Sequence, residues 1–337
     1  NAIGSEFDPT PFATLFTGMI FANLFYWCTN QYVIQRTLAA KNLAEGQKGV
    51  LFSGFFKVLV PFMMMFPGVI AYHLYGGVGE AGGLASIDLA YPRLIRDVLP
   101  VEATGFFLAV LLGAVFSSFN SLLNSAATLF CLDVYLPYKE SRGIAVVDDA
   151  LLLKVAKRAS IVIALFSFIV APLLQFAADG LWQVIRVFTG FYNIPIIAIV
   201  IVGLFTRHVP ALGPKLVIVF HVIAYGLLQF VFKQAVDIHF LHLYAILFFI
   251  EIGIMLAVGY WRPRAELWTY TTESRVDMSP WALAGPCAVT LFSCVVALYL
   301  TFSPLGLVGG GSTLYGPILG LLLAMNAAIW WRGLRSA

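Results

Sequence analysis

The sequence has 337 residues, of which 61% are hydrophobic and only 11% charged, with a net charge of +3. Soluble globular domains carry about 25% charged residues, so this composition excludes a soluble fold and predicts helices that cross a lipid bilayer. The basic residues are scattered among short loops, which excludes a nucleic-acid-binding face. The sequence therefore predicts an all-α polytopic membrane protein.

Long apolar stretches separated by polar loops predict about nine transmembrane helices. In chain order they are residues 11–35, 49–74, 101–134, 152–176, 180–206, 211–232, 237–260, 279–303 and 313–331. Residues 1–10 are polar and begin with Asn1 rather than Met, so we interpret them as the remnant of an extracellular loop. We therefore expect the chain to be the C-terminal part of a longer protein.

The distribution of Lys and Arg predicts the orientation of these helices, because cytoplasmic loops carry more of them. Alternate loops hold fifteen basic residues on one side and three on the other, namely Arg93, Arg96 and Lys233. The first helix is therefore expected to enter from the outside, and the C-terminus is expected to be cytoplasmic. This arrangement is typical of a cytoplasmic (inner) or plasma membrane.

The first span contains FANLFYWCTNQYVIQR, a polar and aromatic cluster inside an apolar helix. Its polar and aromatic members are Asn23, Tyr26, Trp27, Thr29, Asn30 and Gln31. Lipid cannot satisfy these amides, so they must face protein or water. A helix broken at mid-membrane is where secondary transporters bind their substrates, and aromatic faces beside amides suit a sugar. The alternative is an interfacial aromatic belt.

Among the charged residues within predicted spans, we single out Lys57, Arg186 and Glu251. A charge at mid-bilayer costs about 2.5–3.5 kcal/mol even on the lenient insertion scale, so such residues commonly mark a transport pathway. The structural alternative is that each one snorkels to the interface or pairs inside the helix bundle.

The third span carries Ser117, Ser121, Asn124 and Thr128 at spacings of three or four residues, so they share one helical face. Such a stripe is typical of helix packing. The adjacent hydroxyls of Ser117 and Ser118 are also suitable oxygen ligands for sodium, and the pattern alone leaves both interpretations open.

Other potential sites are weaker. His239 and His242, with Asp237, have a spacing compatible with a metal site, but they lie at the edge of a span. The four cysteines, Cys28, Cys131, Cys287 and Cys294, fall in apolar stretches and are interpreted as small core residues. No phosphate loop, nucleophile elbow or pair of intramembrane carboxylates is present, so the sequence favours a protein that is not an enzyme.

The stretch FANLFYWCTNQYVIQRTLAAKNLAEGQKG, followed by FKVLVPF and SSFNSLLNSAATLFCLDVY, resembles the sodium:solute symporter family, and most closely its sodium/glucose and sodium/galactose branch. The resemblance extends over residues from about 11 to 210. It implies a leucine-transporter-type fold of two inverted five-helix repeats. Residues 11–206 would form the second repeat, residues 207–337 four trailing helices, and the first repeat would lie outside this chain.

The resemblance also implies roles for individual residues. The sugar-contacting asparagine falls on Asn23, the aromatic residue that closes the inner side of the sugar site on Tyr26 with Trp27 beside it, and the sugar-binding lysine on Lys57. The sodium ligands fall on the carbonyl of Ala114 and the side chains of Ser117 and Ser118.

One position departs from the family pattern. Where the sugar transporters usually have Tyr-Ile-Gln, this chain has Val184-Ile185-Arg186. An arginine can donate hydrogen bonds to hydroxyls, but together with Lys57 it would also favour an acidic sugar or another organic anion. Gln183, three residues earlier, is an alternative counterpart of the glutamine.

We therefore expect sodium-coupled symport of a hexose or related sugar by alternating access. The alternatives are symport of an organic anion held by Lys57 and Arg186, and a sensor that binds sugar without transporting it. The expected partners are the sodium ion, a small-molecule sugar and the lipid bilayer. No cofactor is expected beyond sodium as the coupling ion, and the sequence does not indicate an oligomeric state.

Overall fold

The computed structural model describes most of the chain. The described residues are 10–77, 83–143, 148–176, 181–233, 235–236, 238–269, 276–303, 305–307 and 310–336. Residues 1–9 of the expected loop remnant, together with Asp237, lie outside them.

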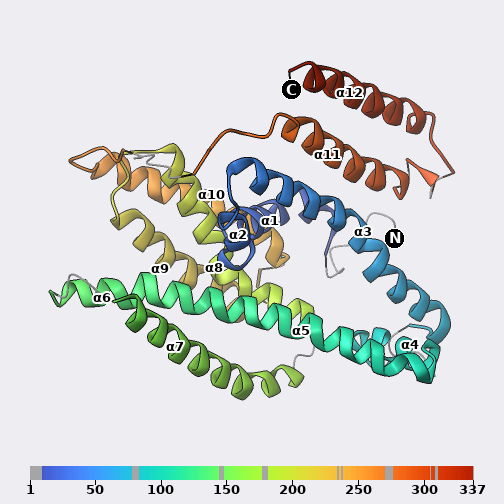
Figure 1. Cartoon of the computed structure of the whole chain (residues 1–337), viewed down its shortest axis with the longest axis horizontal. Coiled ribbons are helices and arrows are strands. Elements are labelled where there is room, and N and C mark those ends of the chain that lie inside the picture. Colours follow the sequence, from blue (N-terminus) through green and yellow to red (C-terminus); the bar gives the residue numbers. More distant parts are fainter. Residues whose placement is uncertain are drawn as a thin grey trace. The chain divides into compact units, whose positions relative to one another are not determined.

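The described residues are predominantly α-helical (Figure 1). The helices are α1 (Gly18–Cys28), α2 (Gln31–Leu38), α3 (Leu43–Tyr75), α4 (Ala90–Val98), α5 (Val101–Leu129), α6 (Leu136–Ser141), α7 (Asp149–Val170), α8 (Leu181–Phe205), α9 (Leu212–Gly226), α10 (Phe240–Trp261), α11 (Ala284–Thr301) and α12 (Tyr315–Ser336). Within the described part, eight helices are long and apolar enough to cross a membrane. The prediction of a polytopic membrane protein is confirmed.

Each of the last eight predicted spans corresponds to one of these long helices. The agreement has a physical cause, since a helix satisfies all of its backbone hydrogen bonds internally and lipid offers none. The first predicted span differs, because it consists of two short helices, α1 and α2, separated by Thr29 and Asn30. Helices α5 and α9 each continue into a π-helical turn, at Phe130–Tyr135 and Leu227–Val231.

The chain divides into two compact units. The first unit contains Asn1–Phe25, Arg36–Phe66 and Phe191–Ala337, and the second contains Tyr26–Gln35 and Pro67–Gly190. The broken helix, α3 and α8 each contribute residues to both units.

The core of the first unit lies where α8, α9 and α10 meet. Val202, Val217 and Met255, one from each helix, form a buried apolar cluster. Helix α10 is the most buried of the long apolar helices, with 44% of its most apolar stretch inside the protein. Helix α10 contacts both α9 and α1, which accounts for apolar residues on more than one of its faces.

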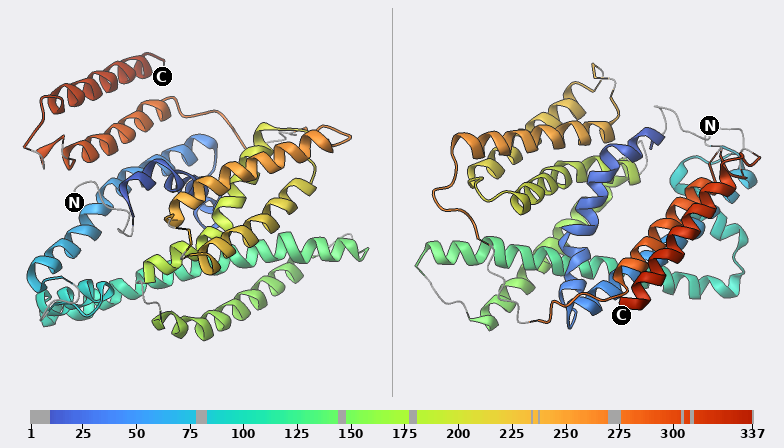
Figure 2. Two further views of the ribbon diagram at one scale, coloured as in Figure 1. Left: turned by 180° about the vertical axis from the view of Figure 1, so that it is seen from behind. Right: turned by 90° about the horizontal axis from the view of Figure 1, so that it is seen from above.

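Helices α11 and α12 of the same unit run side by side in the views of Figures 1 and 2. A chain of hydrogen bonds joins them. The Trp330 indole donates to Thr290 Oγ1 at 2.8 Å, Thr290 donates to Asn326 Oδ1 at 2.9 Å, and the Asn326 amide donates to Ser293 Oγ at 2.7 Å. Such contacts replace the hydrophobic driving force that lipid removes, at about 1 kcal/mol each.

In the second unit, α5 and α7 pack against one another (Figure 1). An open cavity of about 410 Å³ lies between them. Its polar lining consists of Asn124 and Thr128 from α5 and Lys157 and Ser160 from α7. Two of these residues belong to the polar stripe predicted from the sequence.

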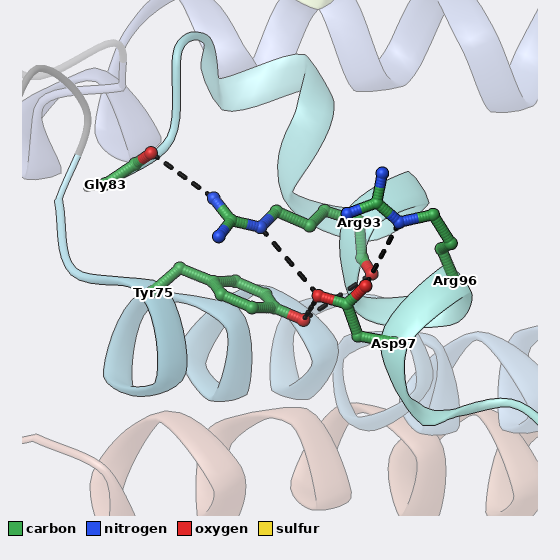
Figure 3. Close-up of polar contacts among 5 residues, drawn as sticks. All are labelled: Tyr75, Gly83, Arg93, Arg96 and Asp97. Carbon is green, nitrogen blue, oxygen red and sulfur yellow. Dashed lines mark hydrogen bonds and ion pairs between the residues drawn. The ribbon is translucent and has the colours of Figure 1, made fainter.

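A polar cluster ties the short helix α4 to the end of α3 (Figure 3). Tyr75 Oη donates to Asp97 Oδ2 at 2.9 Å, and Arg96 Nε lies 3.1 Å from Asp97 Oδ1. The Arg93 guanidinium lies 4.2 Å from the centre of the Tyr75 ring and donates to the Gly83 carbonyl at 3.3 Å. The hydrogen bonds from Tyr75 and Arg96 hold the pKa of the Asp97 carboxyl below its usual range. The positive-inside count predicts that this cluster is extracellular.

Asp97 is expected to make the local stability of α4 depend on acid pH. Its folded-state pKa is lowered, so its contribution is complete above the unfolded-state pKa of about 3.9 and is lost as the pH falls through the folded value. Amide hydrogen-exchange protection of residues 90–98 in the full-length protein should fall below about pH 4. Asp97→Asn should lower that protection already at neutral pH and remove most of its acid dependence. Equal protection in both proteins at pH 7 would contradict the prediction.

Candidate substrate and sodium site

The first helix is broken at the predicted polar cluster. Helix α1 ends at Cys28, and α2 begins at Gln31. The Asn30 side chain accepts a hydrogen bond from the Tyr32 backbone N–H at 3.3 Å, which is the typical interaction of a helix N-cap. Asn30 therefore has a structural role in starting α2. The break leaves backbone groups near Thr29 outside regular helix, as substrate sites of secondary transporters require.

Two tyrosines bridge this break within the second unit. Tyr26 Oη and Tyr32 Oη are hydrogen bonded at 2.6 Å, and their rings meet edge to face. The Trp27 ring lies edge-on to Tyr26, with the ring centres 5.3 Å apart, and remains 39% exposed. The structure thus brings Tyr26 and Trp27 together as an aromatic pair, held in place by Tyr32.

Helix α2 is joined to the polar face of α5. Gln35 Oε1 accepts a hydrogen bond from the Asn124 amide at 3.2 Å, and the Gln35 amide donates to the Ser121 carbonyl at 3.4 Å. These two contacts connect α2 with the helix that carries the candidate sodium ligands. Movement of α2 would therefore be transmitted directly to α5.

The hydroxyl groups of α5 fall into two classes. Ser121 and Thr128 donate to carbonyl groups of their own helix, at 2.9 and 2.8 Å. The hydroxyls of Ser117 and Ser118 are exposed, and neither forms a hydrogen bond with another described residue. Ala114 is exposed one turn earlier on the same helix. Ser117 and Ser118 thus retain free oxygen atoms, which a sodium ligand needs and a helix-packing hydroxyl does not.

Asn23 and Lys57 belong to the first unit. Asn23 is exposed on α1, and its amide donates to the Met19 carbonyl at 2.9 Å, which leaves its side-chain oxygen as an acceptor. Lys57 is exposed on α3. Their contact with substrate stays a prediction.

The N-terminal part of α1 is packed tightly against α10. Phe21 stacks on Phe248 with the ring centres 3.9 Å apart. A Cβ atom added to Gly18 would lie 1.7 Å from the Leu241 carbonyl oxygen, so the two backbones touch at this point. Thr17 Oγ1 and His242 Nδ1 are hydrogen bonded at 2.9 Å. Helix α10 therefore fixes the position of the helix that presents Asn23.

The fifth span contains the two candidate counterparts of the family's glutamine. Arg186 and Gln183 are both half-buried in the part of α8 that belongs to the second unit. Gln183 Oε1 is buried and has no hydrogen-bond partner among the described residues. An unsatisfied acceptor in an apolar environment is costly, so Gln183 is suited to receive a hydrogen bond from a bound hydroxyl group.

The histidines of the seventh span have other uses. His239 caps the start of α10, where its Nδ1 accepts from the Leu241 N–H at 3.3 Å, and His242 contacts Thr17. Among the described residues no group of three His, Cys, Asp or Glu side chains is arranged to hold a metal ion.

Tyr32 and Gln35 were not singled out from the sequence. Both lie in the FANLFYWCTNQYVIQR stretch, and their polarity inside a predicted span was a usable signal. Their roles depend on contacts across the helix break and with α5, which helical periodicity does not reveal.

Comparison with known proteins identifies the family. Residues 6–214 match the model of the sodium:solute symporter family. The chain belongs to this family. It is 39% identical, over 91% of its length, to an uncharacterized symporter of Escherichia coli strain K12 called YidK. It is 37% identical over 60% of its length to a sodium/glucose cotransporter of Vibrio parahaemolyticus, and 27% identical over 80% to sodium/glucose cotransporter 1 of Ovis aries.

The chain spans about half or less of the length of these symporters: 52% of the Escherichia coli protein, 38% of the Vibrio protein and 45% of the sheep protein. Membership of the family and the long apolar helices identify an integral membrane protein of a transporter family.

Proposed function

We propose that the full-length protein is a sodium-coupled symporter of a hexose or related neutral sugar that works by alternating access. The observation that carries this proposal concerns Ser117 and Ser118, whose hydroxyls form no hydrogen bond with the described residues. Both lie on α5, the helix that hydrogen bonds to the broken helix. Sodium bound there would act on α5, and the Gln35 contacts would pass its effect to α2. The sodium/glucose cotransporters among the relatives support the same ion and substrate class.

The aromatic pair of Tyr26 and Trp27 and several polar groups support a sugar as the substrate. Tyr26 and Trp27 offer apolar ring surface to the C–H faces of a sugar, while Asn23, Lys57 and Gln183 offer hydrogen-bonding groups to its hydroxyls. The orphan oxygen of Gln183 is an acceptor, so it suits a neutral hydroxyl group and repels a carboxylate. This feature favours a neutral sugar over an anionic one.

The driving force is sufficient for accumulation. One sodium ion that crosses about 100 mV releases about 2.3 kcal/mol. A tenfold concentration gradient adds about 1.4 kcal/mol, and together they support accumulation of several hundredfold. We propose that bound sodium favours the outward-open state. The protein would lie in a cytoplasmic (inner) or plasma membrane, with its C-terminus in the cytoplasm.

The second candidate function is symport of an acidic sugar or other organic anion. The observation that favours it is the positive charge of both Lys57 and Arg186 at positions within spans. Under this alternative the two cations would clamp a carboxylate, and neutral sugars would compete poorly.

The test is uptake by the full-length protein in proteoliposomes with an inward sodium gradient. Labelled galactose should accumulate with sodium and fail to accumulate with potassium, and galactose should compete better than galacturonate. Gln183→Ala should raise the half-saturating sugar concentration at least about tenfold, because the sugar would lose one hydrogen bond to a buried group. Arg186→Gln is the matched variant on the same helix and should retain galactose uptake. Stronger competition by galacturonate, abolished by Arg186→Gln, would replace the sugar proposal with the anion alternative.

A further inference from the structure

A histidine and a glutamate meet in the interior of the first unit. His221 on α9 and Glu251 on α10 are both 0% exposed, and His221 Nδ1 is hydrogen bonded to Glu251 Oε1. Both residues lie within helices that are long and apolar enough to cross the membrane. Ionised groups at such depth are costly, so their protonation states must be considered together.

The hydrogen-bonding pattern favours a carboxyl group over a carboxylate. Glu251 Oε2 is buried and has no hydrogen-bond partner among the described residues. An ionised glutamate would leave negative charge on this unpartnered oxygen, which burial makes very unfavourable. A carboxyl group that donates from Oε1 to His221 Nδ1 leaves Oε2 as a neutral carbonyl oxygen. In this form the imidazole carries its own proton on Nε2 and is uncharged.

The side chains that the structure describes beside the pair include two tyrosines. Tyr225, on the same helix as His221, stacks on its ring at 5.4 Å, and Tyr244 of α10 lies beside Tyr225. The portions of neighbouring helices in this unit, 18–25 of α1 and 191–205 of α8, contain no charged residue. None of the ion pairs formed by Lys or Arg among the described residues includes Glu251. A single proton shared by the two side chains is therefore what keeps the pair neutral.

We propose that His221 and Glu251 form a proton-binding site between α9 and α10. The ligand is one proton, held between Glu251 Oε1 and His221 Nδ1. Withdrawal of this proton leaves one net negative charge without solvent, and addition of a second proton leaves one net positive charge. The site therefore stays singly protonated across neutral pH and exchanges its proton when α9 and α10 separate enough to admit water. It lies on helices that carry none of the candidate sodium or sugar ligands.

The proton site lies on the helix that contacts α1. Helix α10 carries Glu251 and also holds the N-terminal part of α1 through the backbone contact at Gly18 and the stacking of Phe21 on Phe248. The neutral, hydrogen-bonded pair of His221 and Glu251 holds α9 against α10. Loss of the proton would weaken the packing of α9 against α10, and with it the position of α10 against α1.

The first experiment is infrared spectroscopy of the full-length protein in lipid bilayers, in H₂O and in D₂O. The C=O stretching band of a protonated carboxyl group should be present at pH 7 and shift in D₂O after exchange. Glu251→Gln should abolish one such band, and it should fold because its amide can still donate to His221 Nδ1. Glu102→Gln, which changes an exposed residue at the start of α5, should leave the band unchanged. A wild-type spectrum without a protonated carboxyl band at pH 7, or one unaltered by Glu251→Gln, would overturn the proposal.

A second measurement observes the histidine of the pair. Nitrogen-15 solid-state NMR of labelled histidines in the same bilayers should assign to His221, by comparison with His221→Gln, an uncharged imidazole with an unprotonated, hydrogen-bonded Nδ1 at pH 7. A doubly protonated His221 imidazole at pH 7 would show that the pair does not share a single proton in the way proposed. Both measurements are independent of sodium and sugar, so they remain decisive if the transport proposal fails.

Discussion

Gly18→Ala is expected to destabilise the protein by about 3 kcal/mol or more, because overpacking against a backbone group cannot be relieved by a side-chain rotation. The added Cβ would lie 1.7 Å from the Leu241 carbonyl oxygen and 2.8 Å from the Tyr244 Cβ atom. Helix α1 must therefore move away from α10 or change direction. The displacement would disturb both the Phe21–Phe248 stack and the position of Asn23. The measurement is the thermal unfolding midpoint of the full-length protein in detergent.

The matched control is Gly253→Ala on α10. A Cβ atom at Gly253 would meet nothing within 4 Å, and alanine favours a helix by up to about 1 kcal/mol relative to glycine. The midpoint of this variant should be unchanged or slightly raised. If Gly18→Ala and Gly253→Ala unfolded at the same temperature, the close contact between α1 and α10 would be refuted.

The transmembrane helices were predictable because one physical requirement dominates them. Lipid forces every backbone group into an internal hydrogen bond, so apolar length alone locates helices such as α8 and α10 to within a few residues. The break between α1 and α2 was also indicated, since several amides in an apolar stretch cannot all face lipid. The precise position of the break was not, because it depends on the cap formed by Asn30.

The partners of individual side chains were not predictable in the same way. Glu251 was recognised as a charged residue in a span, but its partner His221 lies 30 residues away on another helix. Helical periodicity states which residues share a face of one helix, and it does not state which faces of two helices meet. The same limit applies to Gln35, whose partner Asn124 lies 89 residues away.

Some of the candidate ligands were predictable from the residues themselves, and others were not. The charge of Lys57 in an apolar span and the family resemblance pointed to the same residue independently. For α5, the sequence left packing and sodium binding equally open, because both use small hydroxyl residues at helical spacing. In the structure, Ser121 and Thr128 donate to carbonyl groups of their own helix, whereas the Ser117 and Ser118 hydroxyls form no hydrogen bond with the described residues. Sodium binding by Ser117 and Ser118 stays a prediction.

Substitution of Ser117 or Ser118 is expected to change the sodium dependence of uptake. Ser118→Ala in the full-length protein is expected to raise the sodium concentration for half-maximal sugar uptake at least about tenfold, equivalent to about 1.4 kcal/mol of lost binding free energy. Ser117→Ala should act in the same direction. Both changes remove an oxygen atom that has no hydrogen-bond partner among the described residues, and neither removes apolar packing. Sodium-dependent uptake into proteoliposomes, measured over a range of sodium concentrations, checks this result.

Ser121→Ala is the control that separates a ligand from a helix-packing hydroxyl. Its hydroxyl already donates to the Ser117 carbonyl, so its loss should change the sodium dependence by less than about twofold, within the cost of one neutral hydrogen bond. The double variant Ser117→Ala, Ser118→Ala should lose sodium-driven accumulation but keep the thermal stability of the wild type, because no hydrogen bond is broken. If Ser118→Ala and Ser121→Ala had the same sodium dependence, the Ser117 and Ser118 hydroxyls would not be the ligands of the ion. Sodium would then not act on α2 through α5 and Gln35.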